Sequence, residues 1–353
     1  MAVRKLLERI IKSKPYNLQD LLAQVQRVRT TSTHLAICAS PTGPNWLGIR
    51  NATLQLFPDA CVELPQYYSQ PLLTDADLLL LAQTILQQEF KNVVFSGFPP
   101  YFIKLIEALQ GNMQQQLGII LHGTFSEVET GGKISEAMLL PLQLLDEKKI
   151  SKVAAVRKDV AAFIGQLKNR PAYTLHNKCV VPNDIKAAIA KSPQKQIGIF
   201  GTENFNKNLH NQVCGAAMVP DGHIYVTQPQ LYTYLNTRYI TGIPRSNHHQ
   251  FLGYLASMDV NLHLSFSESW GQIAAESMAL GVPCLTSPNT NLLDNDEELK
   301  QLLTVIRTDS PVCIADQIET VLSTPGLGDR CIKYIAGINR EADVLMQKFL
   351  ESE

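Results

Sequence analysis

Short apolar runs alternate with amphipathic helical stretches from Thr33 onward, which is typical of a parallel α/β sheet. In the first half, this pattern predicts strands over residues 34–39, 92–96, 118–121, 152–156 and 172–175. A helix is predicted over residues 75–88, with Thr74 as its N-cap. The first half therefore has the pattern of a doubly wound domain.

The composition turns to Pro, Asn, Lys and Ala around residues 181–196, and the alternation then restarts. Further strands are predicted over residues 197–200, 223–226, 261–264 and 283–286, and a last helix over 332–349. We therefore expect an α/β chain of two doubly wound domains, residues 1–180 and 181–330, followed by a C-terminal helix within 331–353.

Composition narrows the class of protein. The chain has 353 residues, of which 45% are hydrophobic, so each half can build a full core. The net charge of −1 disfavours nucleic-acid binding. Seven cysteines without a CxxC pair fit a reducing compartment, and neither an 18-residue apolar run nor a signal peptide is apparent. We expect a cytoplasmic protein.

Two segments allow two interpretations each. Asp75-Ala76-Asp77 has the spacing of a metal-binding DxD motif, but acids that open a helix also favour its positive N-terminal dipole, and we favour that second role. The pattern of residues 3–14 predicts a basic amphipathic helix. We favour packing of its apolar face on its own domain and keep peripheral contact with the inner face of a membrane as the alternative.

The most informative stretch runs from Leu262 to Pro283 and predicts a buried strand, a polar loop, a helix and a Gly-Val-Pro turn. Ser269 and Gln272 have capping-box spacing, so the helix is predicted to start there. Its first N–H groups would face the carboxyl end of the strand, which suits phosphate oxygens. Gly271 would let a ligand approach the backbone closely.

Two carboxylates flank this helix start. Glu276 shares a helix face with Gln272 and Ala275, and the small alanine leaves room beside it. A carboxylate only accepts hydrogen bonds, so Glu276 suits a ribose diol, whereas Glu268 lies before the helix and serves another group. The pattern favours an extended nucleotide-sugar site over two surface acids near a helix start.

The stretch S-x-x-E-S-W-G-x4-E-S-M-A-x-G-V-P resembles the E-x7-E signature of retaining glycosyltransferase family 4. This resemblance implies the GT-B fold: two Rossmann-like domains face each other across a cleft, and the last helix crosses back to the N-terminal domain. It implies that Glu268 contacts the transferred sugar and that Glu276 binds the ribose hydroxyls. Ser269, Trp270, Gly271 and Gln272 would complete the donor site.

Residues 197–203, followed by Lys207-Asn208, resemble the strand-G-R-x4-K-N segment of the same family. By this resemblance Gly201 and Lys207 line the donor site, and Lys207 neutralises the leaving diphosphate. Thr202 stands where the family has an arginine. Either another cation substitutes, or catalysis is weaker, or the donor is held differently.

The resemblance implies two elements in the N-terminal half. His122 follows the strand predicted over 118–121, where the family often has a histidine that contacts the donor sugar. A lone histidine is more commonly structural, so both roles stay open. The loop over residues 40–48 resembles the family's glycine-containing acceptor-side loop, which makes Gly43 and Gly48 candidate residues.

The implied reaction moves a sugar from a nucleotide-diphosphate sugar to a hydroxyl of a glycan, a lipid-linked glycan or a protein, with retention. We expect the reaction to need neither a cofactor nor a metal ion. If the enzyme instead inverts, His122 is the first candidate base. A non-hydrolysing nucleotide-sugar epimerase and a catalytically silent GT-B subunit are the alternatives.

Overall fold

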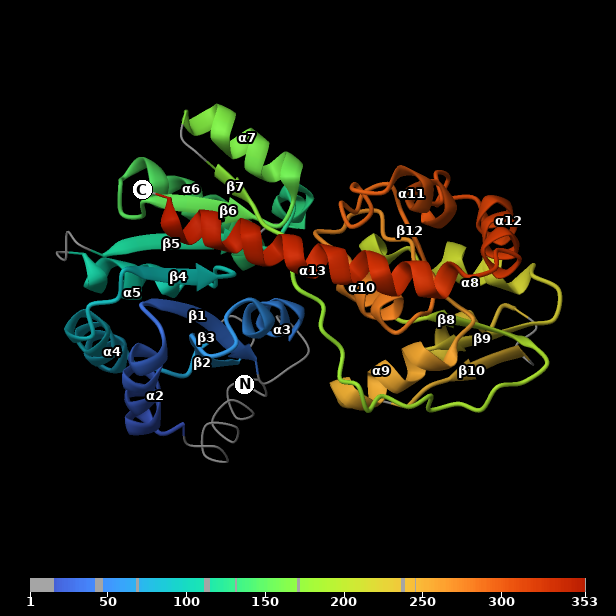
Figure 1. Ribbon diagram of the computed structural model, residues 1–353, viewed down its shortest axis with the longest axis horizontal. Helices are drawn as coiled ribbons and strands as arrows, with labels where there is room; N and C mark the ends of the chain where they lie inside the picture. Colours follow the sequence, from blue (N-terminus) through green and yellow to red (C-terminus); the bar gives the residue numbers. More distant parts are fainter. Residues whose placement is uncertain are drawn as a thin grey trace. The chain divides into compact units, whose positions relative to one another are not determined.

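A computed structural model of the chain describes residues 16–41, 47–67, 70–110, 115–130, 132–169, 172–235, 239–244 and 246–352. The helix predicted over residues 3–14 and the candidate Gly43 lie outside these residues. The chain divides into two compact units (Figure 1). Unit 1 comprises Met1–Asn177 and Ala342–Glu353, and unit 2 comprises Lys178–Glu341.

Unit 1 is built on a seven-stranded sheet in the order β3-β2-β1-β4-β5-β6-β7. Its strands are β1 (His34–Pro41), β2 (Cys61–Tyr67), β3 (Gln70–Pro71), β4 (Asn92–Ser96), β5 (Gln116–Leu121), β6 (Lys152–Ala155) and β7 (Ala172–Thr174). Every neighbouring pair is parallel except β2 with β3. Parallel strands need crossover helices, which is why helices alternate with strands along this unit.

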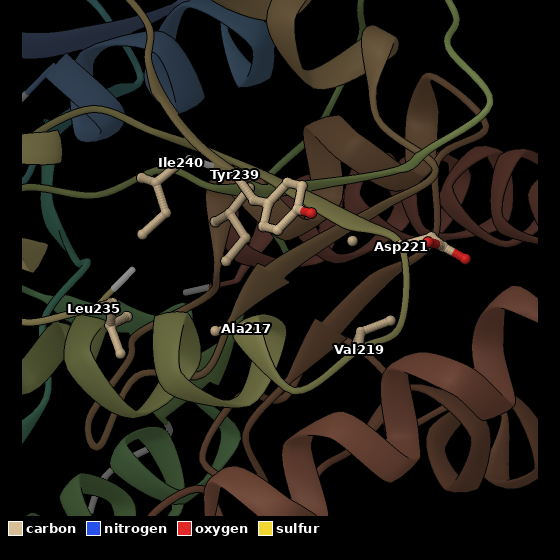
Figure 2. Close-up of a pocket in the computed structure, with 8 residues that line it drawn as sticks. Ala217, Val219, Asp221, Leu235, Tyr239 and Ile240 are labelled. Carbon is tan, nitrogen blue, oxygen red and sulfur yellow. The ribbon is translucent and has the colours of Figure 1, made fainter. Parts of the chain in front are cut away.

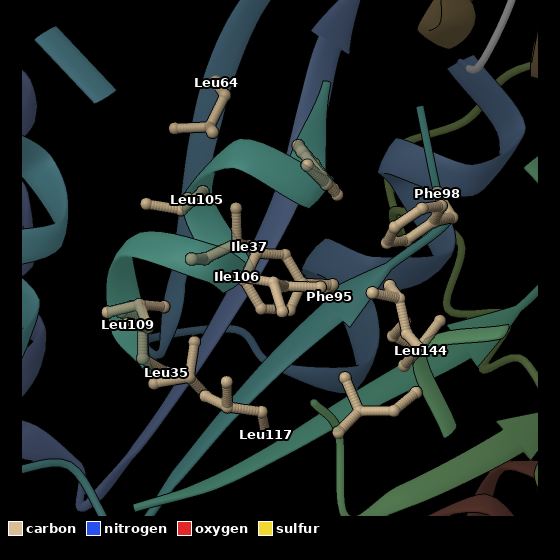
Figure 3. Packing of buried hydrophobic residues seen from close by; sticks show 14 of the residues in the cluster. Leu35, Ile37, Leu64, Phe95, Phe98, Leu105, Ile106, Leu109, Leu117 and Leu144 are labelled. Atoms are coloured by element: carbon tan, nitrogen blue, oxygen red, sulfur yellow. The ribbon is translucent and has the colours of Figure 1, made fainter. Parts of the chain in front are cut away.

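The helices of unit 1 are α2 (Leu18–Thr31), α3 (Leu47–Leu56), α4 (Asp75–Gln87), α5 (Phe102–Leu109), α6 (Gly132–Asp146) and α7 (Lys158–Lys168), with a 3-10 helix over Phe125–Thr130. Their apolar faces bury the central strands. Figure 3 shows Leu35, Ile37, Phe95 and Ile106 packed together in this core. The rings of Phe95 and Phe102 lie 5.3 Å apart between centroids.

Helix α4 confirms the capping role of the DxD-like segment. The Thr74 hydroxyl accepts a hydrogen bond from the Asp77 N–H at 3.2 Å, and Asp77 accepts one from the Thr74 N–H at 2.8 Å. This reciprocal pair is a capping box. Asp75 pairs with Lys104 at 2.6 Å. Both carboxylates therefore have partners within the domain.

Unit 2 holds a five-stranded, fully parallel sheet in the order β10-β9-β8-β11-β12. Its strands are β8 (Lys195–Ile199), β9 (Gly222–Val226), β10 (Ile240–Gly242), β11 (Val260–His263) and β12 (Cys284–Thr286). Its helices include α8 (Leu209–Ala217), α9 (His248–Ser257), α10 (Gln272–Ala279), α11 (Glu297–Leu303) and α12 (Pro311–Leu322). The strand order reverses between β8 and β11, and ligands of open α/β sheets bind at the carboxyl ends of such a pair.

The last helix, α13 (Leu327–Glu351), belongs to both units along its length. Its first turns pack in unit 2, where the Tyr334 hydroxyl donates to the Leu292 carbonyl at 2.6 Å. Its last turn belongs to unit 1, where the buried Lys152 ammonium donates to the carbonyls of Leu350 and Ser352 at 3.3 and 2.9 Å. A cation at these carbonyls complements the negative end of the helix dipole.

Candidate functional site

The sequence-predicted donor residues gather at the carboxyl ends of β8 and β11. The segment after β8 carries Gly201, Thr202 and Lys207, and the segment after β11 carries Glu268 and Ser269. The two strands are hydrogen-bonded neighbours. Their following segments are joined as well, because the Phe266 N–H donates to the Asn206 carbonyl at 2.8 Å.

Glu268 is the centre of this cluster. Its Oε2 accepts hydrogen bonds from Lys207 Nζ at 2.7 Å, from His263 Nε2 at 2.8 Å and from the Ser265 hydroxyl at 3.3 Å. Its Oε1 accepts from the Ser269 N–H at 3.1 Å. The side chain of Glu268 is 13% exposed. The carboxylate is thus held on several sides near the carboxyl edge of the sheet.

The electrostatics of Glu268 keep it ionised. Burial alone would raise the pKa of this carboxyl, but the neighbouring charges and hydrogen bonds of His263 and Lys207 outweigh that effect. Together they hold the pKa well below its usual range. Glu268 is therefore an anion at neutral pH. The sequence did not single out His263, although it is the last residue of the strand that leads into the motif.

The segment that carries Lys207 is anchored through its backbone. The Gln212 amide donates to the Lys207 carbonyl at 2.7 Å and accepts from the Leu264 N–H at 3.1 Å. Asn208 adopts the left-handed conformation at φ 52°, and its amide donates to the Leu264 carbonyl at 3.1 Å. The Asn of the Lys-Asn pair therefore fixes the loop in place next to the Glu268 segment.

Thr202 and Gly201 lie earlier in the same segment. Thr202 is exposed, and no hydrogen bond ties its side chain to Glu268 among the described residues. The Gly201 carbonyl accepts from the Thr227 hydroxyl at 2.6 Å. Gly201 is also packed closely, because a Cβ there would lie 3.1 Å from Leu209.

The predicted start of helix α10 is wrong. Ser269 does not cap this helix; the N-cap is Gly271, and no side chain makes a capping hydrogen bond there. Gly271 has φ +85°, a left-handed conformation that turns the chain abruptly into the helix. The Ser269 N–H is already bonded to Glu268, so the residues before Gly271 form a carboxylate-bound turn instead of a helical one.

Glu276 is buried on α10 and has partners that the sequence did not show. Its Oε1 accepts from His248 Nε2 at 2.9 Å and from the Gln272 amide at 3.2 Å. The Glu276 side chain is 5% exposed, whereas that of His248 is 37% exposed. The hydrogen bond to Glu276 raises the pKa of His248, against the effect of its partial burial. His248 begins α9, so three-dimensional contact alone reveals its role.

Trp270 lies between the two carboxylates in sequence but does not offer its ring to a ligand. Its side chain is 1% exposed, and its carbonyl accepts from the Thr290 hydroxyl at 2.8 Å. The indole therefore belongs to the core. A contact between Trp270 and a donor would have to use the backbone.

In unit 1, His122 follows β5 and is buried, at 7% exposure. Its Nε2 lies 2.9 Å from the Ser96 hydroxyl, which lies 2.6 Å from the Thr53 hydroxyl. The Thr53 hydroxyl donates to the Ile49 carbonyl at 2.7 Å. Three side chains from α3, β4 and the end of β5 thus form one hydrogen-bonded row.

The donor and the acceptor of each hydrogen bond in this row follow from its last member, the Ile49 carbonyl. A carbonyl only accepts, so Thr53 has spent its proton on Ile49, and Ser96 must donate to Thr53. His122 Nε2 then donates to Ser96. Burial lowers the pKa of His122 from 6.5 to about 4, so the ring is neutral with its lone pair on Nδ1. This buried Nδ1 makes no hydrogen bond within the described residues.

Gly48 lies in a helix and not in a loop. The predicted loop over residues 40–48 is shortened at both ends, because β1 continues to Pro41 and α3 begins at Leu47. A Cβ on Gly48 would meet no atom within 4 Å. The glycine is therefore not required by packing.

The described residues also contain a cavity, which lies away from the cluster around Glu268. A cavity of about 360 Å³ lies at the amino-terminal ends of β9 and β10, lined by Ala217, Val219, Asp221, Leu235, Tyr239 and Ile240 (Figure 2). The strands are parallel, so this end is opposite to the one that carries Glu268. No three His, Cys, Asp or Glu side chains in the described ranges could hold a metal ion. No helix in the same ranges has the length and apolar character to span a bilayer.

Comparison with known proteins gives a fold and no sequence family. No protein-family model matches the chain, and no curated protein matches it. Many solved structures resemble it, among them the three described below. HepE from Anabaena, in complex with UDP and glucose, has a TM-score of 0.63 at 14% identity and covers 90% of this chain and 99% of its own.

Sucrose-phosphate synthase from Thermosynechococcus elongatus has a TM-score of 0.61 at 14% identity, with 90% of this chain and 98% of that chain covered. The E. coli trehalose-6-phosphate structure bound with UDP-2-fluoro glucose has a TM-score of 0.62 at 10% identity, with coverage of 91% and 99%. At these identities the likeness shows the fold: the chain consists of two Rossmann-like α/β domains of the GT-B type.

Proposed function

We propose that this chain is a glycosyltransferase similar to retaining family 4, which moves a sugar from a nucleoside-diphosphate sugar to an acceptor hydroxyl. Unit 2 is the donor domain and unit 1 the acceptor domain in this proposal. The observation that carries it is the ionised Glu268, held by Lys207 and His263 at the carboxyl edge of the sheet. A fixed carboxylate there suits the hydroxyls of a transferred sugar.

The nucleoside part of the donor is assigned to Glu276. Its carboxylate accepts hydrogen bonds only, and a ribose diol supplies two donors. Gln272 and His248 already bond to one oxygen of Glu276, so they would orient the carboxylate towards the ribose. HepE was seen with UDP and the E. coli structure with UDP-2-fluoro glucose, which makes UDP-sugars the first donors to test.

The diphosphate is assigned to the space between these two carboxylates. The N-terminus of α10 has no side-chain cap, so the first N–H groups of the helix remain for phosphate oxygens. Lys207 supplies the cation. In this proposal lysine and helix amides stabilise the leaving group without a metal or another cofactor.

Retention is the stereochemical course that His122 favours. A general base works best with a pKa near the working pH, and burial lowers the pKa of His122 to about 4. Its neutral ring suits acceptance of a hydrogen bond from a substrate hydroxyl better than removal of a proton. In a retaining front-face reaction the leaving phosphate can take the acceptor proton, so a dedicated base is not required.

The acceptor is a hydroxyl of a glycan, a lipid-linked glycan or a protein. We place the reaction in the cytoplasm, because all seven cysteines are free thiols, as suits a reducing compartment. Peripheral contact with a membrane through residues 3–14 stays part of the proposal as a way to reach a lipid-linked acceptor.

A silent GT-B subunit is the second candidate. Thr202 favours it, because this exposed side chain carries no charge where related segments have an arginine. Such a subunit would need a partner transferase and would show no turnover alone.

A screen of purified protein with UDP-, GDP- and ADP-sugars, with and without glycan acceptors, tests the function. The proposal expects acceptor-dependent release of nucleoside diphosphate with one of these donors. Donor consumption without an acceptor would indicate an epimerase. Thermal stabilisation by a nucleotide without turnover would indicate the silent subunit, and no binding at all would exclude the donor site.

A further inference from the structure

Lys207 and Glu268 neutralise each other in the free protein. Their charged atoms lie 2.7 Å apart, and the lysine side chain is 29% exposed while the glutamate is 13% exposed. The proposed function needs this same ammonium at the diphosphate. A lysine that already serves a carboxylate must share or change its partner when a second anion arrives.

Of the three groups that donate to Glu268 Oε2, His263 and Lys207 differ in their freedom to move. His263 is the last residue of β11, and its backbone is in register with Thr286 of β12. Its side chain is only 7% exposed. A Cβ on Gly271 would lie 3.7 Å from the His263 ring, so the motif loop packs beside it. The imidazole is therefore fixed by the sheet and its surroundings.

Lys207 has a fixed backbone and a movable side chain. Gln212 holds its carbonyl at 2.7 Å, and the neighbouring Asn208 is tied to the carbonyls of Leu264 and Thr308 at 3.1 and 2.7 Å. Beyond the Cα atom, the four-carbon stem keeps its rotational freedom, and the partly exposed ammonium can change direction. A shift of the lysine thus needs no movement of the loop.

We propose that Lys207 exchanges partners when the donor binds: it leaves Glu268 for the diphosphate, and His263 keeps Glu268 in place. The inference rests on the proposed function. Glu268 then competes with the diphosphate for one ammonium, which weakens nucleotide binding in the free protein. His263 is a positioning residue, because it acts on the sugar through the carboxylate it holds.

The exchange predicts that removal of the Glu268 charge improves nucleotide binding. Glu268→Gln should tighten the binding of the best ligand among UDP, GDP and ADP by roughly three- to tenfold, since Lys207 is freed from a partly exposed ion pair. The corresponding nucleoside, which lacks phosphates, should bind both proteins equally. Isothermal titration calorimetry measures both affinities.

A double variant separates competition from simple repulsion between Glu268 and phosphate. In a Lys207→Met background, Glu268→Gln should leave nucleoside-diphosphate affinity within twofold of the Lys207→Met protein. If the gain persists without the lysine, direct repulsion explains it and the exchange is wrong. If Glu268→Gln weakens binding in the wild-type background, the exchange is also wrong.

The positioning role of His263 is tested by a pair of variants. His263→Gln keeps an N–H donor that can reach Glu268, whereas His263→Leu removes it. The leucine variant should lose at least about tenfold in kcat, the loss of a hydrogen bond to a charged group, with unchanged nucleotide affinity. The glutamine variant should recover most of this loss. Circular dichroism checks that both are folded.

Should the leucine variant fail to fold, His263→Asn replaces it, because its shorter amide cannot reach Glu268. If His263→Gln has the same kcat as His263→Leu, or as His263→Asn where that variant replaces it, the positioning role of His263 is wrong. These outcomes are distinct from a failure of the proposed function. If the proposed function were wrong, the wild-type protein itself would bind no nucleoside diphosphate or would turn over no sugar donor.

Discussion

The two units carry different chemistry at the carboxyl ends of their strands. In unit 1, His122 is neutral, and a row of hydroxyls from Ser96 and Thr53 fixes its tautomer. In unit 2, Glu268 is ionised and lies between Lys207 and His263. Each site lies at the ends of parallel strands within a sheet of Rossmann-like topology.

We interpret the difference as one architecture adapted to two tasks of the proposed function. In the proposed function the diphosphate and the reacting sugar carry charge, and the lysine, the helix amides and the two carboxylates of unit 2 would compensate it. A neutral hydroxyl needs an oriented acceptor, and a buried imidazole with its lone pair on Nδ1 supplies that. We therefore assign the charged diphosphate to unit 2 and hydrogen bonding of neutral groups to unit 1.

The largest effect is expected from Glu268. Glu268→Gln should lower kcat by about 100-fold or more, because it removes a preorganised charge at the reacting sugar. Initial rates of nucleoside-diphosphate release measure this loss. The isosteric Gln preserves packing and makes the charge the only major change. Full activity of this variant would show that the charge of Glu268 has no part in the reaction. The contrast between a charged site in unit 2 and a neutral site in unit 1 would then have no functional meaning.

Glu276→Ala should weaken nucleotide affinity by roughly 1.5–3 kcal/mol, the range for hydrogen bonds to a charged group. Turnover at saturating donor should change much less, because ribose binding is remote from the bond that breaks. Calorimetry with the best nucleoside diphosphate measures the affinity. His122→Gln, in the other unit, is the control and should leave it unchanged. Equal affinities for wild type and Glu276→Ala would contradict the assignment.

The neutrality of His122 predicts an acid-sensitive unit 1. Its folded pKa of about 4 lies below the ordinary 6.5, so stability is full above pH 6.5 and falls as the pH drops towards 4. Between pH 8 and pH 5, the titration of His122 should lower the free energy of unfolding by roughly 2 kcal/mol. Urea unfolding, with hydrogen exchange read on β4 and β5, measures it. His122→Gln should flatten the pH profile, and an unchanged profile would show that His122 is not the cause.

The smallest effect concerns the turn into α10. Gly271→Ala should destabilise the protein by about 1–2 kcal/mol, because alanine is strained at φ +85°. Ser269→Ala should be close to neutral, since the Ser269 hydroxyl caps no helix. Thermal unfolding of the two variants compares them directly. A larger loss of stability for Ser269→Ala than for Gly271→Ala would indicate that the Ser269 hydroxyl does cap the helix.

Much of the sheet could be predicted from apolar runs. The strand predicted over 92–96 is observed with the same bounds, and the others that were predicted differ by up to two residues at an end. β2 was missed because Pro65 interrupts its pattern, although the strand pairs with β1 through Pro65 itself. β10 has only three residues at the sheet edge, too few for a periodic signal.

The site was only partly predictable for a physical reason. The sequence placed Glu268 and Glu276 by motif, but it could not show that His263 and His248 bond to them. His248 lies 28 positions before Glu276, and only the fold brings them together. The predicted capping box at Ser269 is absent because the Ser269 N–H bonds to the adjacent Glu268 carboxylate and the helix begins only after the left-handed Gly271.

We propose that unit 2 binds a nucleoside diphosphate at the carboxyl ends of β8 and β11. A crystal structure with the tightest-binding nucleoside diphosphate would show whether the nucleotide lies there. We expect ribose hydroxyls on Glu276 and phosphate oxygens at the first amides of α10. The Lys207 ammonium should lie on phosphate, with Glu268 still bonded to His263. A nucleotide bound in unit 1, or in the cavity at the opposite end of β9 and β10, would contradict it.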